Sequence, residues 1–527
     1  MTTVTSRSFH DIRQALLSHQ EVALIDLREE DPFAQEHPLF AANIPLSKLE
    51  LEIYARVPRR DTAITLYDDG EGLTAQAGKR LLALGYSDVA VLDGGLAGWR
   101  SAGGELFRDV NVPSKAFGEL VESVRHTPSL AAEEVQALLD AKADVVVLDA
   151  RRFDEYQTMS IPGGISVPGA ELVLRVAELA PSPSTQVIVN CAGRTRSIIG
   201  TQSLVNAGIP NPVAALRNGT IGWTLAGQQL AHGQASRFGE VTDSTRTNAA
   251  QRARKVADRA GVLRLDREGL ANWQADHART TYLFDVRTAE EYAAGHVPGS
   301  RWVPGGQLVQ ETDHVASVRG ARIVLLDDDG VRANMSASWL AQMGWQAAVL
   351  DGLEPADFSQ AGDWQAPLPE LPEVPGIGVE QLDSWLQASG TVLLDFTTSA
   401  NYVSRHIPGA HWAIRAQLSQ ALEQLPVAER YVLTCGSSLL ARFAAADLQA
   451  LTRTPVYLLE GGTAQWIAAG KPLEQGETRL AVARTDRYRR PYEGTDNPRE
   501  AMQGYLDWEF GLVAQLERDG THGFSVA

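Results

Sequence analysis

Gln186-Val187-Ile188-Val189-Asn190-Cys191-Ala192-Gly193-Arg194-Thr195-Arg196-Ser197 is the most informative stretch of this 527-residue chain. An apolar, β-branched run ends at Asn190, and a helical pattern begins near Ser197. A strand, a short loop and a helix in this order are typical of α/β proteins with a mostly parallel sheet. Functional sites in such sheets lie beyond the carboxyl ends of the strands, which is where this loop falls.

The loop predicts a reactive cysteine. Cys191 is expected to lie among backbone N–H groups and at the positive end of a helix dipole, where a thiol pKa is lowered and the thiolate is favoured. Arg194 and Arg196 add positive charge and planar guanidinium groups that suit an oxyanion. A small buried core cysteine is the alternative. We predict Cys191 as the nucleophile, and as substrate-binding residues Ala192, Gly193, Arg194, Thr195, Arg196 and Ser197.

The same pattern recurs four times along the chain. Each unit begins with a hydrophobic strand that ends in an aspartate: Asp26, Asp149, Asp285 and Asp395. A second buried strand leads into a loop 40 to 44 residues later, and the loop positions are Asp69, Cys191, Asp329 and Cys435. A helix, a further strand and a glycine turn follow in every unit. A sequence period of this kind indicates repeated copies of one structural unit.

With these motifs the chain resembles a tandem array of four rhodanese (sulfurtransferase) domains. The resemblance rests on the strand-Asp-x-Arg opening, the aromatic-x-x-x-His-Ile/Val-Pro-Gly stretch (Tyr292 to Gly299 and Tyr402 to Gly409), the six-residue loop and the Gly-Gly-x-x-x-Trp end. Ser160 replaces the histidine in the second unit, and Thr397 replaces the arginine in the fourth. The resemblance implies an α/β protein of four rhodanese-like domains, each a mostly parallel sheet flanked by helices.

The patterning also predicts where the domains begin and end. The expected domains are residues 1–112, 128–235, 260–363 and 376–475, followed by a tail, residues 476–527. The linkers are the segment from Val112 to Pro128, the polar segment from Ser236 to Ala260, and a proline-rich spacer, residues 366–375.

The tail carries a charged cluster, Arg487-Tyr488-Arg489-Arg490-Pro491-Tyr492. We interpret it as a solvated strip packed on the last domain, because runs of charge are usually surface features. A docking or anion-binding patch is the alternative. Trp508, Phe510 and Leu512 predict a short amphipathic helix that packs against protein.

The first and third loops carry aspartate instead of cysteine, at Asp69 and Asp329. A carboxylate cannot accept and pass on sulfur, so these two domains are predicted to be inactive. The resemblance implies pairs of one Asp-bearing and one Cys-bearing domain, which we expect to be domains one with two and three with four. A metal site at Asp68 and Asp69, or at Asp327, Asp328 and Asp329, is the alternative, and it would need further oxygen ligands. No calcium-loop spacing follows, and we predict neither a metal nor a cofactor.

The fourth loop, Cys435-Gly436-Ser437-Ser438-Leu439-Leu440, contains no charge. Without an electropositive setting the thiolate is less favoured, so we interpret Cys435 as vestigial and keep it as a possible second site. Asp149 and Arg151 are possible supports of the Cys191 loop, and a purely structural pair is the alternative.

The resemblance implies a thiosulfate sulfurtransferase. The Cys191 thiolate would take the outer sulfur of a small anionic donor such as thiosulfate, and the resulting persulfide would pass its sulfur to cyanide or a thiol. A 3-mercaptopyruvate sulfurtransferase and a non-enzymatic sulfur relay or scaffold are the alternatives. A related phosphatase or arsenate reductase needs an arginine six positions after the cysteine, where this chain has Ser197.

Composition excludes some classes of binding partner and indicates a cellular location. The net charge of −18 argues against nucleic acids and anionic membranes, both of which attract basic surfaces. No apolar run is as long as a membrane span of about 20 residues, and Met1 to Gln20 lacks the pattern of a signal peptide. The two cysteines lie in different repeats and predict no disulfide framework, so we expect a cytoplasmic location.

Overall fold

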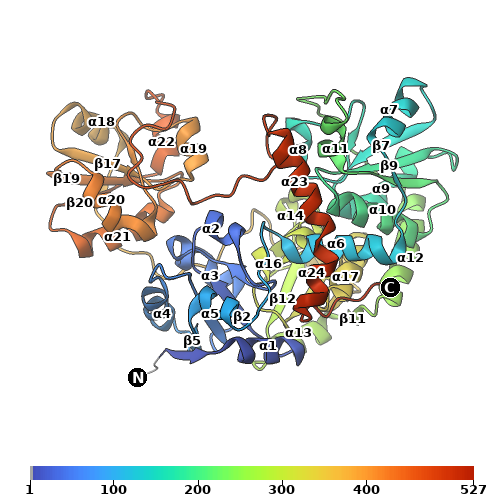
Figure 1. Ribbon diagram of the computed structural model, residues 1–527, viewed down its shortest axis with the longest axis horizontal. Coiled ribbons are helices and arrows are strands. Elements are labelled where there is room, and N and C mark those ends of the chain that lie inside the picture. Colours follow the sequence, from blue (N-terminus) through green and yellow to red (C-terminus); the bar gives the residue numbers. More distant parts are fainter. Residues whose placement is uncertain (1–3) are drawn as a thin grey trace.

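The computed structural model describes residues 4–527, and the first three residues of the predicted first domain lie outside the described residues. Figure 1 shows four separate sheets, each flanked by helices, with the C-terminal segment crossing between them. Every strand pairing within the sheets is parallel. The predicted fold class is therefore confirmed. None of the helices in the described part of the chain combines the length and apolar character that a membrane span requires.

Domain 1 contains a five-stranded sheet of order β1-β5-β4-β2-β3. Its strands are β1 (Thr5–Arg7), β2 (Ala23–Asp26), β3 (Ala42–Asn43), β4 (Ile64–Tyr67) and β5 (Val89–Leu92). Its helices are α1 (Phe9–Leu17), α2 (Glu30–Gln35), η1 (Leu46–Lys48), α3 (Leu49–Arg56), α4 (Thr74–Ala83) and α5 (Gly95–Ser101).

Domain 2 repeats this order as β6-β10-β9-β7-β8. Its strands are β6 (Ser129–Leu130), β7 (Val145–Asp149), β8 (Ile165–Ser166), β9 (Gln186–Asn190) and β10 (Val213–Leu216). Its helices are α7 (Ala132–Asp140), α8 (Phe153–Thr158), η2 (Gly169–Glu171), α9 (Leu172–Leu179), α10 (Thr195–Ala207) and α11 (Gly219–Leu225). The predicted strand before Cys191 is thus β9, and the following helix begins two residues before Ser197.

Domain 3 has the order β11-β15-β14-β12-β13. Its strands are β11 (Leu263–Leu265), β12 (Thr281–Asp285), β13 (Arg301–Trp302), β14 (Arg322–Leu326) and β15 (Gln346–Leu350). Its helices are α13 (Arg267–Ala275), α14 (Ala289–Ala294), α15 (Gly305–Gln310), α16 (Thr312–Val315), α17 (Arg332–Gln342) and η3 (Pro355–Asp357).

Domain 4 has the order β16-β20-β19-β17-β18. Its strands are β16 (Gly376–Ile377), β17 (Thr391–Asp395), β18 (His411–Trp412), β19 (Arg430–Thr434) and β20 (Val456–Leu459). Its helices are α18 (Val379–Gln387), α19 (Ser399–Ser404), η4 (Arg415–Gln417), α20 (Leu418–Gln424), α21 (Leu439–Leu451) and α22 (Gly462–Ala468).

Strand register keeps the loop positions Cys191 and Cys435 but shifts those in domains 1 and 3. In each domain the strand that ends in aspartate (β2, β7, β12 or β17) pairs with the strand that leads into the loop (β4, β9, β14 or β19). The aspartate lies opposite the last residue of that second strand: Asp26 opposite Tyr67, Asp149 opposite Asn190, Asp285 opposite Leu326, and Asp395 opposite Thr434. The positions equivalent to Cys191 are therefore Asp68 and Asp327. The choice of Asp69 and Asp329 from the sequence was wrong, because residue counts do not reveal where a strand ends.

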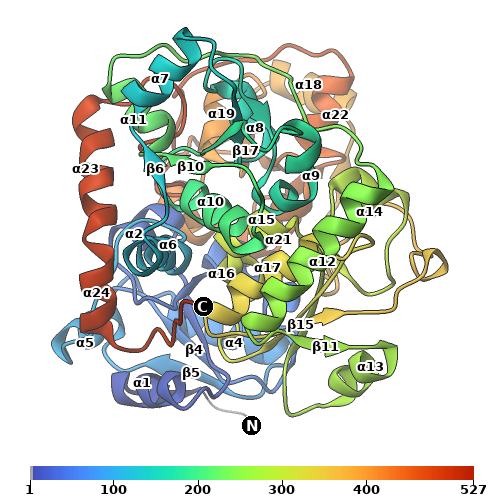
Figure 2. The ribbon, with the colours of Figure 1, turned by 90° about the vertical axis from the view of Figure 1, so that its right-hand side faces the viewer.

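Two predicted linkers contain helices. The segment after domain 1 contains α6 (Val112–Arg125), which has eight buried residues, and it packs against α10. The segment between domains 2 and 3 contains α12 (Asp243–Arg259), which packs against α9, α10 and α17. The tail contains α23 (Arg499–Phe510) and α24 (Leu512–Asp519). Both helices pack against α6, and Figure 2 shows α23 beside α11 as well. These connecting segments therefore bind the domains together.

The domains pair in a nested order. Domain 2 contacts domain 3 through η2, α15 and α17, with Glu171 paired to Arg332 at 2.9 Å. Domain 1 contacts domain 4 through η1 and η4, with Glu50 paired to Arg415 at 2.7 Å. The predicted pairs, one with two and three with four, were wrong. These two pairs, two with three and one with four, still join one Asp-bearing and one Cys-bearing domain each.

Domain 1 also packs on domain 3. The largest hydrophobic cluster of the protein contains Ile53 and Tyr86 of domain 1, Phe117 of α6, and Tyr282 and Trp345 of domain 3. Because this core crosses domain boundaries, the first three domains support each other, whereas domain 4 has separate clusters of its own.

Candidate active site

The Cys191 loop is held at the carboxyl end of β9 by the start of α11. The N–H of Thr220 donates to the Cys191 carbonyl at 2.9 Å, and the N–H of Ile221 donates to the Ala192 carbonyl at 3.0 Å. Gly219 has a φ of +55°, and a Cβ there would lie 2.3 Å from the Cys191 oxygen. Only glycine allows this close approach, so the glycine turn positions the loop.

The thiol of Cys191 is buried, with the residue 2% exposed. Its Sγ donates to the Ser197 hydroxyl at 3.3 Å, and that hydroxyl donates to the Arg194 carbonyl at 2.8 Å. Burial raises the pKa of Cys191, and the charge of Arg196 and the contacts with Ser197 oppose this rise without cancelling it. The expectation of a lowered thiol pKa was therefore wrong for this conformation, because it took no account of burial.

The cover over the loop is the tail helix α23. A Cβ on Gly193 would lie 3.0 Å from the Tyr505 ring and 3.2 Å from a Glu509 oxygen. Thr195 donates to Glu509 at 3.5 Å, and Ile221 forms a small cluster with Tyr505 and other residues of α23. The packed helix predicted around Trp508 is thus present, and the structure places it on domain 2, which the sequence did not indicate.

Arg194 is not directed at a substrate cavity. Its guanidinium group donates to Glu119 of α6 at 2.6 and 2.9 Å, pairs with Glu122, and reaches Asn218 at 3.3 Å. It also lies 4.2 Å from the centre of the Phe510 ring. These contacts occupy the guanidinium group that was predicted to bind an oxyanion, so Arg194 connects the loop to α6 and the tail.

Arg196 lines a cavity of about 430 Å³ next to the loop. It donates to Glu155 of α8 at 2.7 and 2.8 Å. Burial acts against the charge on Glu155, but Arg196 outweighs it and lowers the pKa of Glu155 to about 2. Arg196 thus stays charged and influences both the cavity and the Cys191 thiol.

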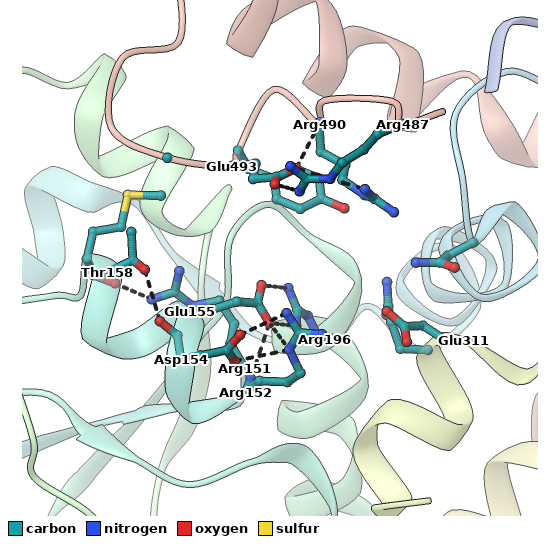
Figure 3. Close-up of a pocket in the computed structure, with 15 residues that line it drawn as sticks. Arg151, Arg152, Asp154, Glu155, Thr158, Arg196, Glu311, Arg487, Arg490 and Glu493 are labelled. Carbon is teal, nitrogen blue, oxygen red and sulfur yellow. Dashed lines mark hydrogen bonds and ion pairs between the residues drawn. The ribbon is translucent and has the colours of Figure 1, made fainter. Parts of the chain in front are cut away.

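The cavity is lined from several parts of the chain. Figure 3 shows Arg151, Arg152 and Arg196 on one side, Arg487 and Arg490 of the tail on another, and Glu311 on a third. The five arginines are accompanied by four acidic residues: Asp154, Glu155, Glu311 and Glu493. Of the loop residues predicted to bind substrate, Arg196 alone lines this cavity, and the buried Cys191 is not among its lining residues.

Arg151 and Asp149 form a buried, two-point ion pair at the end of β7. Arg151 donates to both Asp149 oxygens at 2.9 and 2.8 Å and to the Met159 carbonyl at 2.6 Å. Asn190 donates to the same carboxylate at 3.0 Å and so ties β9 to β7. Because Arg151 also lines the cavity, the pair connects the sheet to the cavity wall.

Comparison with known proteins identifies the repeated unit. Residues 10–102, 131–226, 266–352 and 378–469 each match the family model of the rhodanese-like domain. The chain belongs to this family. A solved structure of a thiosulfate sulfurtransferase from Pseudomonas aeruginosa is 77% identical, with a TM-score of 0.98, and the match covers 99% of this chain and all of that one.

Two curated relatives are more distant. A thiosulfate sulfurtransferase from Azotobacter vinelandii is 27% identical over 207 residues, which are 35% of this chain and 74% of the relative. A putative thiosulfate sulfurtransferase from Mycobacterium tuberculosis is 31% identical over 127 residues, which are 22% of this chain and 43% of the relative.

In the first and third rhodanese-like domains the loop aspartate occupies its own N–H cradle. Asp68 accepts from the N–H groups of Gly70 and Leu73 at 3.1 and 2.6 Å. Asp327 accepts from those of Gly330 and Ala333 at 3.0 and 2.7 Å. Among residues 4–527, no three His, Cys, Asp or Glu side chains gather so that they could hold a metal ion. These carboxylates stand at the position that Cys191 has in domain 2.

The fourth rhodanese-like domain keeps a cradle without arginines. Burial raises the pKa of Cys435, while the backbone N–H groups of Ser438, Leu440 and Ala441 act in the opposite direction. Without a paired arginine, one Asp395 oxygen has no hydrogen-bond partner, and burial raises the pKa of Asp395 to about 7. The Cys435 site therefore offers hydrogen bonds but no fixed positive charge.

Sequence reasoning missed most of the cavity wall. Arg152 and Glu155 lie at α8, whose role no motif indicated. Asn111 is the cap residue before α6, and Glu311 lies between α15 and α16 of domain 3. The tail arginines were noted as a possible anion patch, but the strip on the last domain was preferred. The cluster instead contacts domain 1, where Tyr488 donates to Asp109 at 3.0 Å.

Proposed function

We propose that the protein is a thiosulfate sulfurtransferase that carries the transferred sulfur on Cys191. The observation that supports this most directly is the arginine-lined cavity beside the Cys191 loop, with Arg196 common to the cavity and to the surroundings of the thiol. The full-length similarity to a thiosulfate sulfurtransferase agrees with it. Domains 1 and 3 carry no sulfur in this proposal, because their loops hold aspartate.

In the first step the donor enters with its oxygens towards Arg196, Arg151 and Arg152. Cys191 loses its proton to water, and the thiolate attacks the outer sulfur of thiosulfate. A new S–S bond forms on Sγ while the S–S bond of thiosulfate breaks, and sulfite leaves with the electron pair. The product is a persulfide on Cys191, a covalent intermediate that divides the transfer into two easier steps.

In the second step a cyanide ion or a thiolate attacks the outer sulfur of the persulfide. The S–S bond to Cys191 breaks, its electron pair stays on Sγ, and the thiolate is regenerated. Two separate half-reactions predict ping-pong kinetics. The partners are thus a small anionic donor and a thiol or cyanide acceptor. The two free cysteines suit a reducing compartment, which supports a cytoplasmic location.

The test compares the two cysteines in the full chain. We expect Cys191→Ser to abolish turnover with thiosulfate and cyanide, and Cys435→Ser to leave most of it. Parallel assays with 3-mercaptopyruvate and phenyl phosphate distinguish the alternative donors and the phosphatase chemistry. Equal losses in the two variants, or loss in Cys435→Ser alone, would show that Cys191 is not the carrier.

A further inference from the structure

The cavity beside Cys191 is larger than thiosulfate requires. Its volume is about 430 Å³. Thiosulfate has five non-hydrogen atoms, which take up roughly 150 Å³ if each occupies about the 30 Å³ of a liquid water molecule. The remaining space is sufficient for a second small molecule or for a larger acceptor.

The tail contributes two further arginines to the cavity, Arg487 and Arg490, in addition to the three that face the donor. Arg487 has a side chain that is 38% exposed, and it forms an ion pair with Glu493. A guanidinium group has five N–H donors, so several remain available to a ligand. Arg490 lies beside it, paired with Glu30 at 3.1 Å. Figure 3 shows both arginines across the cavity from Arg196.

A third side of the cavity carries hydrogen-bond acceptors instead of positive charge. Glu311 makes no side-chain hydrogen bond or ion pair with any residue of the described chain, 4–527, and it lines the cavity. Asn111, which is 5% exposed, has an Oδ1 atom without a hydrogen-bond partner. Its backbone is left-handed, with φ of 58°. A buried acceptor left unpaired is unfavourable, so it points to a ligand that donates a hydrogen bond.

From these observations we propose that the sulfur acceptor is a thiol with an α-amino acid head group. The inference rests on the proposed function of Cys191. The carboxylate of the acceptor binds Arg487 and Arg490, and its ammonium group donates to Glu311 and to Oδ1 of Asn111. The thiolate then reaches the persulfide on the Arg196 side, forms an S–S bond with its outer sulfur, and leaves the electron pair of the broken bond on Cys191.

The test uses four thiols of similar size as acceptors with the full-length protein. L-cysteine has both charged groups, cysteamine lacks the carboxylate, 3-mercaptopropionate lacks the ammonium group, and 2-mercaptoethanol lacks both. With rates referred to thiolate concentration, kcat/KM is expected to be highest for L-cysteine. Loss of one charge-assisted contact should lower it about tenfold or more.

Variants assign each head group to its wall. Arg487→Gln should lower kcat/KM for L-cysteine and 3-mercaptopropionate about tenfold relative to cysteamine. Glu311→Gln should lower it for L-cysteine and cysteamine relative to 3-mercaptopropionate. Arg108→Gln and Glu517→Gln change exposed residues that do not line the cavity, and both should keep the wild-type ranking.

A binding measurement separates this proposal from the proposed function. S-methyl-L-cysteine cannot accept sulfur, and calorimetry should detect its binding to wild type and a weaker affinity in both cavity variants. If the enzyme turns over thiosulfate with cyanide but ranks the four thiols equally, the acceptor proposal is overturned while the function stands. If S-methyl-L-cysteine binds as proposed but Cys191→Ser keeps full turnover, the assignment of Cys191 fails instead. Failure of S-methyl-L-cysteine to bind wild type also overturns the acceptor proposal.

Discussion

At the scale of single residues, two arginines of the same loop have different roles. Arg194 is held by Glu119 and Glu122 of α6, whereas Arg196, two positions along, lines the cavity and pairs with Glu155. Arg194 is the cap residue before α10 and Arg196 is the second residue of that helix, so their side chains leave the loop in different directions. The chemistry of a residue type therefore depends on the partner that the backbone assigns to it.

The influence of Arg196 on the thiol can be measured. Arg196→Gln removes the main positive charge that opposes the effect of burial, so the pKa of Cys191 should rise further. The alkylation rate of Cys191 in the Cys435→Ser background should then reach half its maximum at a higher pH than with Arg196 intact. Arg196→Lys keeps the charge and is expected to retain the profile. An unchanged profile in Arg196→Gln would contradict this role.

Glu509 gives a pH-dependent contribution to stability. Burial, together with the nearby Glu119, raises the pKa of Glu509 to about 8, from 4.5. The folded protein therefore binds a proton that the unfolded chain loses between these values, and the free energy of unfolding falls as pH rises from about 4.5 to about 8. The melting temperature of Glu509→Gln should thus decline less with pH than that of wild type.

The control for this comparison is Glu517→Gln, an exposed position on α24. Its melting temperature should follow wild type throughout the pH range. A wild-type decline that persists unchanged in Glu509→Gln would show that Glu509 is ionised in the folded protein.

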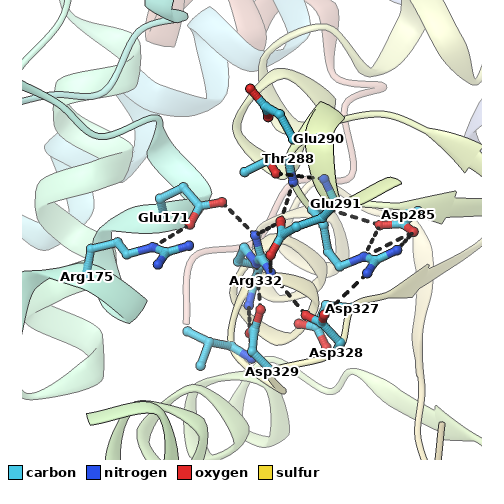
Figure 4. Close-up of polar contacts among 12 residues, drawn as sticks. Glu171, Arg175, Asp285, Thr288, Glu290, Glu291, Asp327, Asp328, Asp329 and Arg332 are labelled. Carbon is cyan, nitrogen blue, oxygen red and sulfur yellow. Dashed lines mark hydrogen bonds and ion pairs between the residues drawn. The ribbon is translucent and has the colours of Figure 1, made fainter. Parts of the chain in front are cut away.

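At the scale of elements, the first turn of α17 joins two domains. Figure 4 shows Arg332 between Glu171 of domain 2 and a group of carboxylates of domain 3. It pairs with Glu171 at 2.9 Å, Glu291 at 2.6 Å and Asp329 at 2.6 Å, and it is 1% exposed. Its pairing with Glu291 repeats that of Arg196 with Glu155. Domain 3 thus uses the equivalent arginine for docking.

Removal of Arg332 should destabilise the protein strongly. Arg332→Met leaves several carboxylates buried without their cation, which typically costs about 3–5 kcal/mol. Thermal unfolding should show a clear decrease in the melting temperature. Arg254→Met is the matched control, because its pair with Asp351 is exposed and should contribute about 1 kcal/mol or less. Similar melting temperatures for the two variants would contradict this assignment.

At the scale of the whole molecule, the chain closes on itself. Domain 4 docks on domain 1 through Glu50 and Arg415, and the tail then returns across domain 1 to cover the Cys191 loop of domain 2. Figure 1 shows the tail crossing between the domains. The cavity is therefore completed only when the last segment of the chain is in place.

A fragment of residues 1–240 should not fold as an independent unit. It exposes the face of domain 1 that packs on Tyr282 and Trp345, and the η2 face of domain 2 that packs on α17. Large exposed apolar surfaces promote aggregation. We expect low solubility and no sharp thermal transition, with recovery on co-expression of residues 241–527. A soluble fragment with a sharp transition and the activity of the full chain would contradict this view.

The sequence alone was sufficient to predict the fold of the repeated unit. Strand-ending aspartates such as Asp149, the glycine turns and the cysteine loop are local features, because each depends on residues close together in the chain. They predicted four parallel sheets, the strand before Cys191 and the family. The position of the loop in domain 3 was missed by two residues, since a strand end depends on pairing with its neighbour.

Tertiary structure alone decided which side chains and segments each repeated unit contacts. Nothing near Arg194 in the sequence indicates that Glu119 would take its guanidinium group, or that Glu509 would cover Gly193. Arg487 reaches the cavity of Arg196 although about 290 residues lie between them. Such contacts arise from the burial of apolar faces between domains, and that burial depends on shape in three dimensions rather than on any local pattern.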